Sequence, residues 1–327
     1  MNLILNKFNT IDKCYKYLER LRWGKQPACP YCGSVHVVAS RSEKHRYFCY
    51  DSKKSFSVTV GSIFEDTRLE LTKWFTIIEL MLNAKQGISA KEIQRNSGVT
   101  YKTAWYAAMR IRCAMIDKCN IELENVVEMD ESYVGGKKRK LCPARPDNTP
   151  DLSNITLNKR GRGCDKAKVV GIVERHGNIV LKVMDRLTFR NLLDMLQQYV
   201  KTDNATLMTD EFKGYANMDK YVEHFVIEHQ KEYVKGAIHT NTVEGFWSIL
   251  KNGIKGNQRA VSKKYLPFYL ISSQYIYNHR EFKGNLFEKF LKEALETDRS
   301  DYMEDYKPVK PVKELAYPRC KKKKKTK

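Results

Sequence analysis

The middle of the chain contains five short segments with the alternating or continuously apolar pattern of β-strands. These predicted strands comprise residues 126–134, 167–174, 178–184, 205–209 and 221–227. His176-Gly177 separates the second segment from the third and is typical of a hairpin turn. The pattern therefore predicts that the second and third strands form a hairpin.

Apolar residues recur at helical spacing between and after these strands. The predicted helices comprise residues 188–200, a segment that begins near Asn241 or Thr242, and residues 265–279. Three strands, a helix, a strand, a short helical segment, a fifth strand and terminal helices follow one another in the order of the ribonuclease H-like fold. We therefore expect an α/β domain of that class.

The helix expected near Asn241, with Thr242 as a suitable N-cap, has two different faces. Its apolar stripe consists of Phe246, Ile249, Leu250 and Ile254. The other side carries Glu244, Trp247, Ser248 and Lys251. Glu244 and Lys251 are seven positions apart and point in nearly the same direction. A carboxylate on such a face is ordinarily a solvated charge, so the meaning of Glu244 depends on acids elsewhere in the chain.

Two of the predicted strands carry acids that can act together with Glu244. Asp130 lies on the first strand, which is central in this fold, and Asp210 follows the fourth. Together with Glu244 they form a set of three carboxylates, which is what a pair of magnesium ions requires for phosphoryl transfer. Glu131 and Glu211 are alternatives to the two aspartates. A strand-end charge at Asp130 and a helix cap at Asp210 are the plain structural interpretations.

Another group of helices is predicted before the strands. Thr72 is expected to cap the first, and Ser89 and Glu92 form a capping box that opens a short helix ending at Gly98. Thr100 caps a longer helix. This arrangement is a helix-turn-helix, although such pairs also occur in bundles that bind nothing. The residues expected to be exposed and to contact DNA are Tyr101, Lys102, Arg110 and Arg112.

The N-terminal region contains an incomplete zinc-ribbon pattern. Cys29-x-x-Cys32-Gly is typical of a zinc knuckle, and Cys49 lies on the facing hairpin, but the expected fourth position is Ser52. A serine hydroxyl is a poor zinc ligand. The open alternatives are weak zinc binding, a metal-free ribbon held by its aromatic residues, or a fourth ligand from Asp51, His45 or His36.

The charge of the chain favours a polyanionic partner. There are 59 Lys and Arg against 38 Asp and Glu in 327 residues, a net charge of +21, and the body stays basic without the lysine-rich C-terminus. The basic segment 137–168 is expected to be either an arm that follows the DNA backbone or a solvated insertion. No apolar run reaches the roughly 20 residues of a membrane span, and no signal peptide is evident. Nine cysteines at irregular spacing argue against a disulfide framework, so we expect a soluble intracellular protein.

Several motifs, taken in order, resemble one family. They are VVEMDESYVGGK, the RGRG…AKVVGIVER segment, LMTDEFKGY, HTNTVEGFWSILKNGIKG and the closing YNHR. They resemble the catalytic domain of Merlin-type DDE transposases and of related bacterial insertion-sequence transposases. The Cys-x-x-Cys-Gly ribbon and the following FSVTVGSIFEDTRLELTKWF are similar to the N-terminal part of that family. The resemblance extends from Arg20 to Arg280.

The resemblance implies that Asp130, Asp210 and Glu244 are the catalytic and metal-binding acids, with Lys251 beside Glu244. It implies magnesium or manganese as cofactor and terminal inverted repeats in double-stranded DNA as substrate. The family usually has a fourth cysteine where this chain has Ser52, which concerns zinc and not the acids.

We therefore expect a transposase that cuts DNA at the ends of its element and joins the freed 3′-hydroxyl to target DNA. The residues expected to extend the DNA path beyond Lys251 are Lys255, Arg259, Lys263 and Lys264. Two ends must be brought together, so a homodimer or higher oligomer is expected. The alternatives are a catalytically inactive transposase-derived DNA-binding protein and a nuclease without strand transfer.

The expected division of the chain has four parts. Residues 1–66 form a zinc-ribbon-like module, 67–120 a helix-turn-helix region, 121–283 a ribonuclease H-like DDE domain, and 284–327 a short helix with a basic disordered tail. The lysine run in the tail is either a nuclear localisation signal, in a eukaryote, or a DNA tether. In a prokaryote we expect the protein in the cytoplasm or nucleoid.

Overall fold

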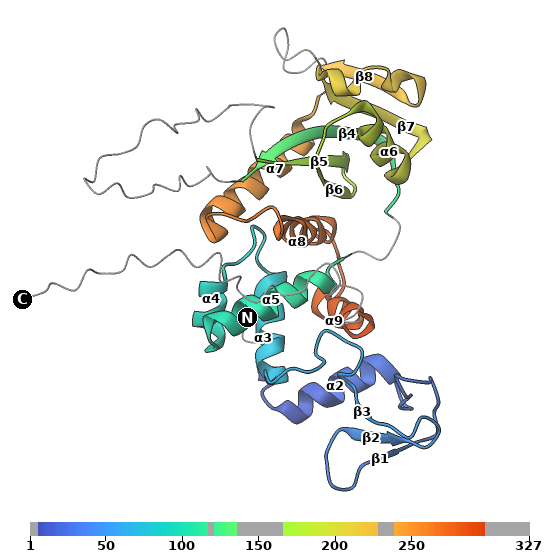
Figure 1. Ribbon diagram of the computed structural model, residues 1–327, viewed down its shortest axis with the longest axis vertical. Helices are drawn as coiled ribbons and strands as arrows, with labels where there is room; N and C mark the ends of the chain where they lie inside the picture. Colours follow the sequence, from blue (N-terminus) through green and yellow to red (C-terminus); the bar gives the residue numbers. More distant parts are fainter. Residues whose placement is uncertain (1–5, 117–120, 136–165, 228–238, 298–327) are drawn as a thin grey trace, which may run out of the picture.

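The computed structural model describes residues 6–116, 121–135, 166–227 and 239–297, and Figure 1 shows their arrangement. The expectations for most of the basic segment 137–168 and for the C-terminal lysine run therefore lie outside the described residues. Within them, no helix is both long and apolar enough to cross a membrane.

A mixed five-stranded sheet forms the centre of the larger part of the molecule. Its strands are β4 (Leu123–Val134), β5 (Ala167–Glu174), β6 (Ile179–Met184), β7 (Val200–Asp210) and β8 (Glu223–Ile227). The strand order is β6-β5-β4-β7-β8, in which β4, β5 and β6 pair antiparallel while β7 and β8 run parallel to β4. These directions confirm the predicted hairpin, and the element order is the one expected for the ribonuclease H-like arrangement.

Helices cover both faces of this sheet (Figure 1). On one face, α6 (Phe189–Tyr199) buries Leu192, Met195 and Leu196 in a core shared with β4, β5 and β7. On the other face, α7 (Asn241–Gly253) and α8 (Leu266–Asn278) pack their apolar side chains against β5 and β6. Because successive strand residues point to opposite faces, each residue of β4 belongs to one of these two layers.

The helices before the large sheet form a separate core with the last described helix. They are α2 (Ile11–Trp23), α3 (Leu71–Leu82), α4 (Ala90–Ser97) and α5 (Tyr101–Ala114), and they enclose α9 (Leu286–Glu296). Phe287 of α9 packs on Phe75 of α3, and Tyr17 of α2 donates a hydrogen bond of 2.9 Å to Glu288. The first and last described helices are therefore parts of one unit.

A small antiparallel sheet packs beside α2. It contains β1 (Val37–Ala39), β2 (Arg46–Cys49) and β3 (Ser55–Ser57). The first two form the hairpin that was expected to carry Cys49, with predicted strands at residues 35–40 and 45–50. Phe56 of β3 is buried between Trp23 and Tyr47. Of the aromatic residues expected to hold the ribbon together, Trp23, Tyr47 and Phe56 pack in its core, whereas Phe48 is not part of this cluster.

Capping confirms several predicted helix boundaries and corrects two. The Ser89, Thr100 and Thr188 side chains each accept a hydrogen bond from the first turn of their helix, and Gly98 ends α4 in the left-handed conformation. Thr72 is not a cap, because α3 already begins at Leu71. Thr242 also lies inside its helix, whose N-terminal amides are capped by a residue of the sheet described below.

The expected position of Trp247 is wrong. Its side chain was expected on the polar side of the helix with Glu244, but it is 3% exposed and packs over Gly171 of β5. A Cβ at Gly171 would lie 2.9 Å from the indole ring, so the missing side chain makes room for the tryptophan. The apolar face of α7 is therefore wider than its sequence spacing indicated.

Candidate active site and zinc ribbon

Two acids meet at the end of the parallel strand pair. The last paired residues of β4 and β7 are Glu128 and Met208, so Asp130 and Asp210 lie level with one another two residues further on. Each of Asp130, Asp210 and Glu131 offers a carboxylate oxygen, and these three oxygens lie within 4.8 Å of one another. The structure thus brings together the two aspartates that the sequence indicated, and it adds Glu131.

Asp130 points toward α7. Its Oδ2 accepts a hydrogen bond of 2.9 Å from Trp247 Nε1. Burial raises the pKa of Asp130 to about 7, with a further contribution from the negative charges of Glu131 and Asp210. A cation bound beside Asp130 would offset the repulsion among the three acids.

Glu131 lies on the opposite side of β4. Its Oε2 accepts a hydrogen bond of 3.0 Å from the hydroxyl of Tyr215, which is 1% exposed in the core beneath α6. The sequence left open whether Asp130 or Glu131 is the functional acid. In the structure both carboxylates reach the same place from the two faces of one strand.

Glu244 lies in the first turn of α7 and is exposed. Its Oε1 accepts a hydrogen bond of 3.1 Å from Thr240 Oγ1. It is outside the group of three acids whose oxygens lie within 4.8 Å. It is one helical turn before Trp247, however, and so shares a helix with the residue that touches Asp130. Lys251, two turns from Glu244, is also exposed.

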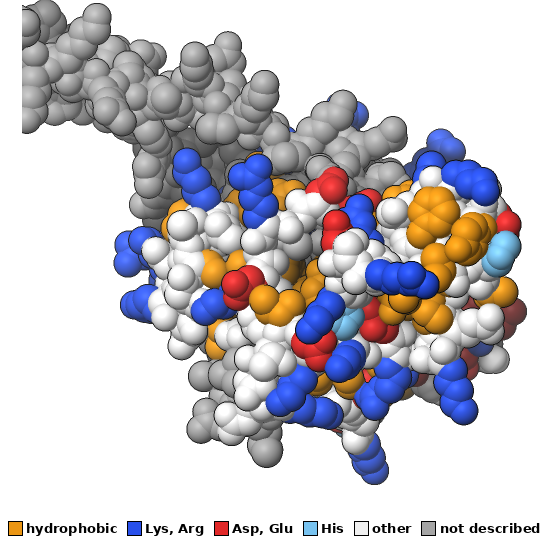
Figure 2. Space-filling view, turned by 90° about the horizontal axis from the view of Figure 1, so that it is seen from below, with side chains coloured by type: hydrophobic (Ala, Val, Ile, Leu, Met, Phe, Trp, Pro, Cys, Tyr) orange, Lys and Arg blue, Asp and Glu red, His pale blue; other side chains and the backbone are white. Residues whose placement is uncertain are grey.

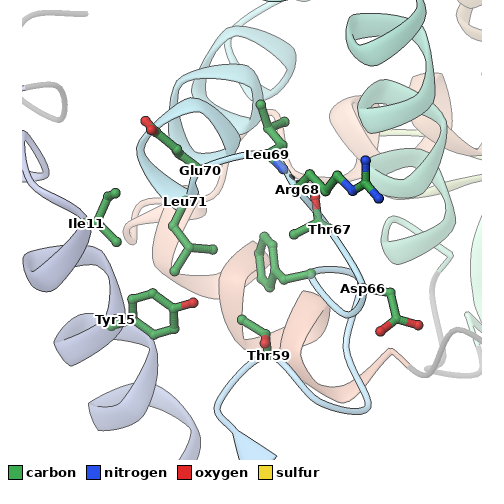
Figure 3. Close-up of a pocket in the computed structure, with 10 residues that line it drawn as sticks. Ile11, Tyr15, Thr59, Asp66, Thr67, Arg68, Leu69, Glu70 and Leu71 are labelled. Atoms are coloured by element: carbon green, nitrogen blue, oxygen red, sulfur yellow. Dashed lines mark hydrogen bonds between the residues drawn. The ribbon is translucent and has the colours of Figure 1, made fainter. Parts of the chain in front are cut away.

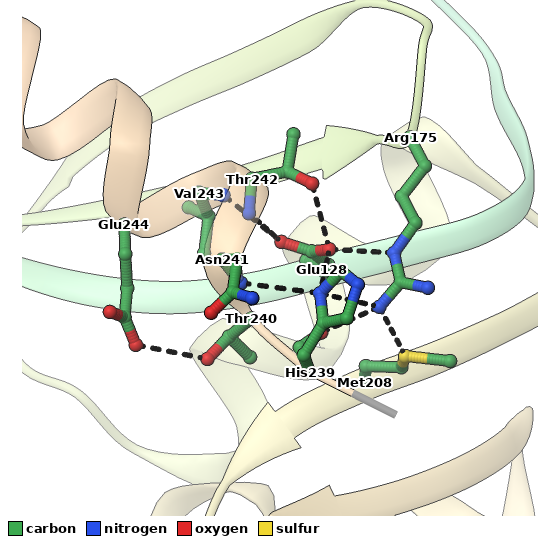
Figure 4. A network of polar contacts seen from close by, with 9 residues as sticks. All are labelled: Glu128, Arg175, Met208, His239, Thr240, Asn241, Thr242, Val243 and Glu244. Carbon is green, nitrogen blue, oxygen red and sulfur yellow. Dashed lines mark hydrogen bonds and ion pairs between the residues drawn. The ribbon is translucent and has the colours of Figure 1, made fainter. Parts of the chain in front are cut away.

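The start of α7 is fixed by a buried acid that sequence reasoning did not identify (Figure 4). Glu128 of β4 is 0% exposed, and its Oε2 accepts hydrogen bonds from the backbone amides of Thr242 at 2.8 Å and Val243 at 3.0 Å. Arg175, just after β5, pairs with the same carboxylate at 2.7 Å and donates to the carbonyl of His239. A carboxylate at a helix N-terminus satisfies free amides and interacts favourably with the helix dipole.

The stability of the metal-free protein should depend on pH through Asp130. Because the folded pKa of about 7 is above the ordinary value of 3.8, ionisation of this group opposes folding, and stability is lost as the pH rises between these values. We expect Asp130→Asn to be more stable than the wild type at pH 8, by up to about 4 kcal/mol, with little difference near pH 4. Thermal unfolding in EDTA across this range measures the difference. A constant difference at all pH values would contradict the assignment.

The zinc-ribbon cysteines gather as the motif predicts. Sulfur atoms of Cys29, Cys32 and Cys49 lie within 4.8 Å of one another. Ser52 occupies the fourth position, where its Oγ is 3.4 Å from the Cys29 sulfur and its amide donates to Cys49. Contacts from Ser52 lower the pKa of Cys49 to about 6, which favours the thiolate that binds metal. Three thiolates around one point fit a zinc ion.

The proposed substitutes for a fourth cysteine lie elsewhere. His45 was one candidate, but its two ring nitrogens contact Glu19 at 2.9 Å and Asp12 at 3.0 Å, both on α2. His36 and Asp51 pair with each other at the surface and are outside the cysteine group. Ser52 is therefore the protein side chain beside the fourth position.

Ser52→Cys should complete the ribbon and tighten zinc binding. A fourth thiolate is a far better ligand than a hydroxyl. We expect the zinc dissociation constant to fall by at least roughly tenfold, the lower end of what even residues outside the ligand shell contribute. Competition with a chromophoric chelator measures this change. Zinc affinity that is unchanged in Ser52→Cys, but lost in Cys29→Ser, would contradict the view that Ser52 lies at the fourth position.

The expected exposed residues of the longer helix, α5, divide into two groups. Tyr101 and Lys102 are exposed at its N-terminal end, as expected. Arg110 and Arg112 are 8% and 4% exposed, so their expected exposure is wrong. Arg110 donates a 2.8 Å hydrogen bond to the carbonyl of Glu65 and lies over the Trp74 ring, while Arg112 stacks on a tyrosine of α8. Long arginine stems can pack in this way while their charged ends find partners.

The two groups should respond differently to substitution. Lys102→Ala should weaken DNA binding by the loss of about one phosphate contact, with a shallower salt dependence and unchanged stability. Arg110→Ala should destabilise the folded protein by roughly 1–3 kcal/mol, because it removes a buried, hydrogen-bonded side chain. Salt titrations of DNA binding and urea unfolding measure the two effects. The opposite pattern would restore Arg110 as a DNA contact.

Basic side chains occur on other surfaces as well. Lys255, Arg259 and Lys263 are exposed after α7, as expected. Figure 2 shows Lys and Arg side chains spread over the face seen from below, among Asp, Glu and hydrophobic groups. The exposed basic residues of the ribbon are Lys25, Arg41, Lys44, Arg46, Lys53 and Lys54.

The pocket in Figure 3 is separate from the acidic group. It has a volume of about 290 Å³ and lies between α2 and the segment that leads into α3. Ile11, Tyr15 and Leu71 line it together with the polar side chains of Thr67 and Arg68. It contains neither the cysteine group nor the strand-end acids, so we assign it no part in the site.

Two protein-family models match parts of this chain. Residues 122–278 match the ISXO2-like transposase domain, and residues 10–54 match the transposase zinc-ribbon domain. A protein in transposable element ISH50 of Halobacterium salinarum is 30% identical over 293 residues, which are 86% of this chain and 92% of that protein. The chain therefore belongs to the ISXO2-like family of insertion-sequence transposases. This confirms the resemblance to insertion-sequence transposases.

The chain also has structural similarity to Mos1 transposase complexes, of which two are described. The Mos1 strand transfer complex has 10% identity and a TM-score of 0.26, covering 69% of this chain and 78% of the other. A pre-cleavage Mos1 transpososome has 10% identity and a TM-score of 0.25, covering 90% and 95%. These TM-scores are too low to assign a fold or a function.

Proposed function

We propose that this chain is an active DDE transposase that cuts the ends of its element at terminal inverted repeats and joins the 3′-hydroxyl to target DNA. The observation that carries the proposal is the meeting of Asp130 and Asp210 at the end of β7, within a chain that belongs to a transposase family. Both reactions are in-line substitutions at phosphorus, so one acidic site serves both.

Asp130, Asp210 and Glu244 would hold the metal ions, with Glu131 as the alternative to Glu244. The donor set fits magnesium or manganese, because these ions prefer carboxylate oxygens and retain water and phosphate as further ligands. When bound, such ions activate the attacking oxygen and stabilise the leaving oxygen. The chain itself contributes placement: Trp247 holds Asp130 by its hydrogen bond, and Tyr215 holds Glu131.

Double-stranded DNA is the proposed partner. Lys251 and the exposed Lys255, Arg259 and Lys263 would contact the backbone next to the acids, and Tyr101 and Lys102 would contact the DNA from the N-terminus of α5. Residues at the N-terminal end of a second helix are those that reach base edges in helix-turn-helix proteins. Joining two element ends requires at least a homodimer.

A cleavage assay on DNA that carries the element's inverted repeats tests the proposal. The repeats are obtained from the DNA on either side of the gene. Magnesium-dependent cuts at both ends, followed by joined products, are the expected result. Cuts without joined products would support a nuclease instead. Specific binding of the repeats without any cut would support the catalytically inactive DNA-binding alternative.

A further inference from the structure

The end of α7 makes a close contact with the turn that leads into α4. Asn257, in the π-helical segment η4 (Ile254–Gln258) that continues α7, donates hydrogen bonds to the carbonyls of Gln86 at 3.1 Å and Gly87 at 2.7 Å. Gln258 donates to the carbonyl of Ile88 at 3.3 Å. Three successive carbonyls before α4 are therefore held by the segment after α7.

Gly253 brings the two backbones together at this contact. It is the last residue of α7 and is buried against the carbonyl oxygen of Gln86, which a Cβ at this position would overlap. π-Helical turns within α-helices often occur at functional positions. Here the widened turn directs the side-chain amides of Asn257 and Gln258 toward residues 86–88, which belong to the unit of N-terminal helices.

Aromatic contacts extend the junction between α5 and the α8 region. The Arg112 guanidinium lies 4.1 Å from the ring centre of Tyr269, and Trp105 meets Tyr265 edge to face at 5.4 Å. The gap lined by Gln86, Arg112, Tyr269 and others has a volume of only about 20 Å³, little more than one water requires. We call this junction, from residues 86–88 and α5 to η4 and α8, the seam.

The helix between the acids and the seam is held at both ends. Glu128 fixes the start of α7 to β4, and Gly253 and Asn257 fix its end to the turn before α4. The helix has 13 residues, so it is about 20 Å long. Trp247, which contacts Asp130, lies six residues before Gly253, so roughly 9 Å of helix connects the strand-end acids to the turn before α4.

We propose that this seam sets the distance between the DNA-recognition helices and the acidic site, and thereby selects which phosphodiester bond is cut relative to the bound sequence. The inference rests on the proposed function, because it takes α4 and α5 as the recognition helices. Gly253, Asn257 and Gln258 are then positioning residues that determine cleavage specificity.

The test compares full-length Gly253→Ala and Asn257→Ala with Gly256→Ala. The last is a matched control in the same segment, because a Cβ at Gly256 meets no atom within 4 Å. The DNA carries one inverted repeat, and cuts are mapped to single nucleotides. The two seam variants should bind the repeat within about twofold of wild type but lose cleavage at the wild-type position by on the order of 10²-fold, as expected for a misplacement of about 1 Å. Cuts should appear at neighbouring phosphates.

A second measurement does not depend on catalysis. Fe²⁺ with ascorbate and hydrogen peroxide produces hydroxyl radicals at the acidic site, and these cut nearby DNA whether or not the enzyme hydrolyses it. A narrow cut pattern in wild type and Gly256→Ala, broadened in Asn257→Ala, supports the seam even if no hydrolysis occurs. An unchanged narrow pattern in both seam variants would overturn it. Asn257→Ala removes only a partly exposed side chain, so it keeps the test decisive if Gly253→Ala does not fold.

Discussion

Asp210→Asn is expected to reduce metal-dependent DNA cleavage by on the order of 10³-fold, the size typical of losing a group that stabilises charge in the transition state. Asp210 ends β7 beside Asp130, and its Oδ1 accepts a hydrogen bond of 3.0 Å from the amide of Phe212. Asparagine keeps the shape and this hydrogen bond but removes the charge that a metal ligand needs. Single-turnover cleavage of a repeat-containing DNA, with binding measured in parallel, gives the effect.

The same assay identifies the third acid. Glu131→Gln and Glu244→Gln should be compared with Glu211→Gln, which removes the neighbouring acid that the sequence left as an alternative to Asp210. We expect Glu244→Gln to be nearly as inactive as Asp210→Asn, and Glu211→Gln to stay within about tenfold of wild type. Full activity in Asp210→Asn would refute the proposed acidic site. If Glu131→Gln lost cleavage activity and Glu244→Gln kept it, the third metal-binding acid would be Glu131 and not Glu244.

Glu128→Ala should destabilise the protein by roughly 3–5 kcal/mol, because it removes a fully buried carboxylate that pairs with a charged side chain. Arg175 would lose its carboxylate, and the amides of Thr242 and Val243 would lose their acceptor. Urea unfolding measures the loss. Glu124→Ala is the control on the same strand, since its ion pair with Lys201 is exposed and is worth about 0–1 kcal/mol.

Glu128→Gln tests how much of the stabilisation comes from the negative charge of Glu128 and how much from its hydrogen bonds to the start of α7. Glutamine still accepts one amide hydrogen bond but carries no charge, so we expect a smaller loss of stability than in Glu128→Ala. An effect of Glu128→Ala no larger than that of Glu124→Ala would mean that α7 is held by its apolar face alone.

Much of the fold follows from local patterns. Alternation and apolar runs located all five strands of the large sheet, and caps such as Ser89 and Thr100 located the start of their helices. These patterns predict the observed elements because they reflect short-range preferences of the backbone. The third strand of the ribbon, Ser55–Ser57, was not predicted, because one apolar residue between two serines gives neither an apolar run nor a repeated alternation.

The candidate site was predictable where chemistry and strand position coincide. Asp130 and Asp210 stand at strand positions that a parallel pair brings level with each other. Glu128 and Arg175 carried no such signal, because an acid on a strand does not reveal which helix will place its amides above it. Arg110 was misjudged for a related reason: charge alone predicts exposure, whereas the carbonyl of Glu65 and the Trp74 ring give this side chain a buried place.

The sequence by itself determined the order of elements, the cysteine group and the two aspartates, because each depends on residue type at a fixed local spacing. Only the tertiary structure decided that α9 completes the core of the N-terminal helices, that Glu128 caps α7, and that Gly253 meets the turn before α4. These contacts join residues far apart in the chain. Their formation depends on shape, burial and complementary hydrogen-bonding groups across a surface, which no periodicity along the sequence records.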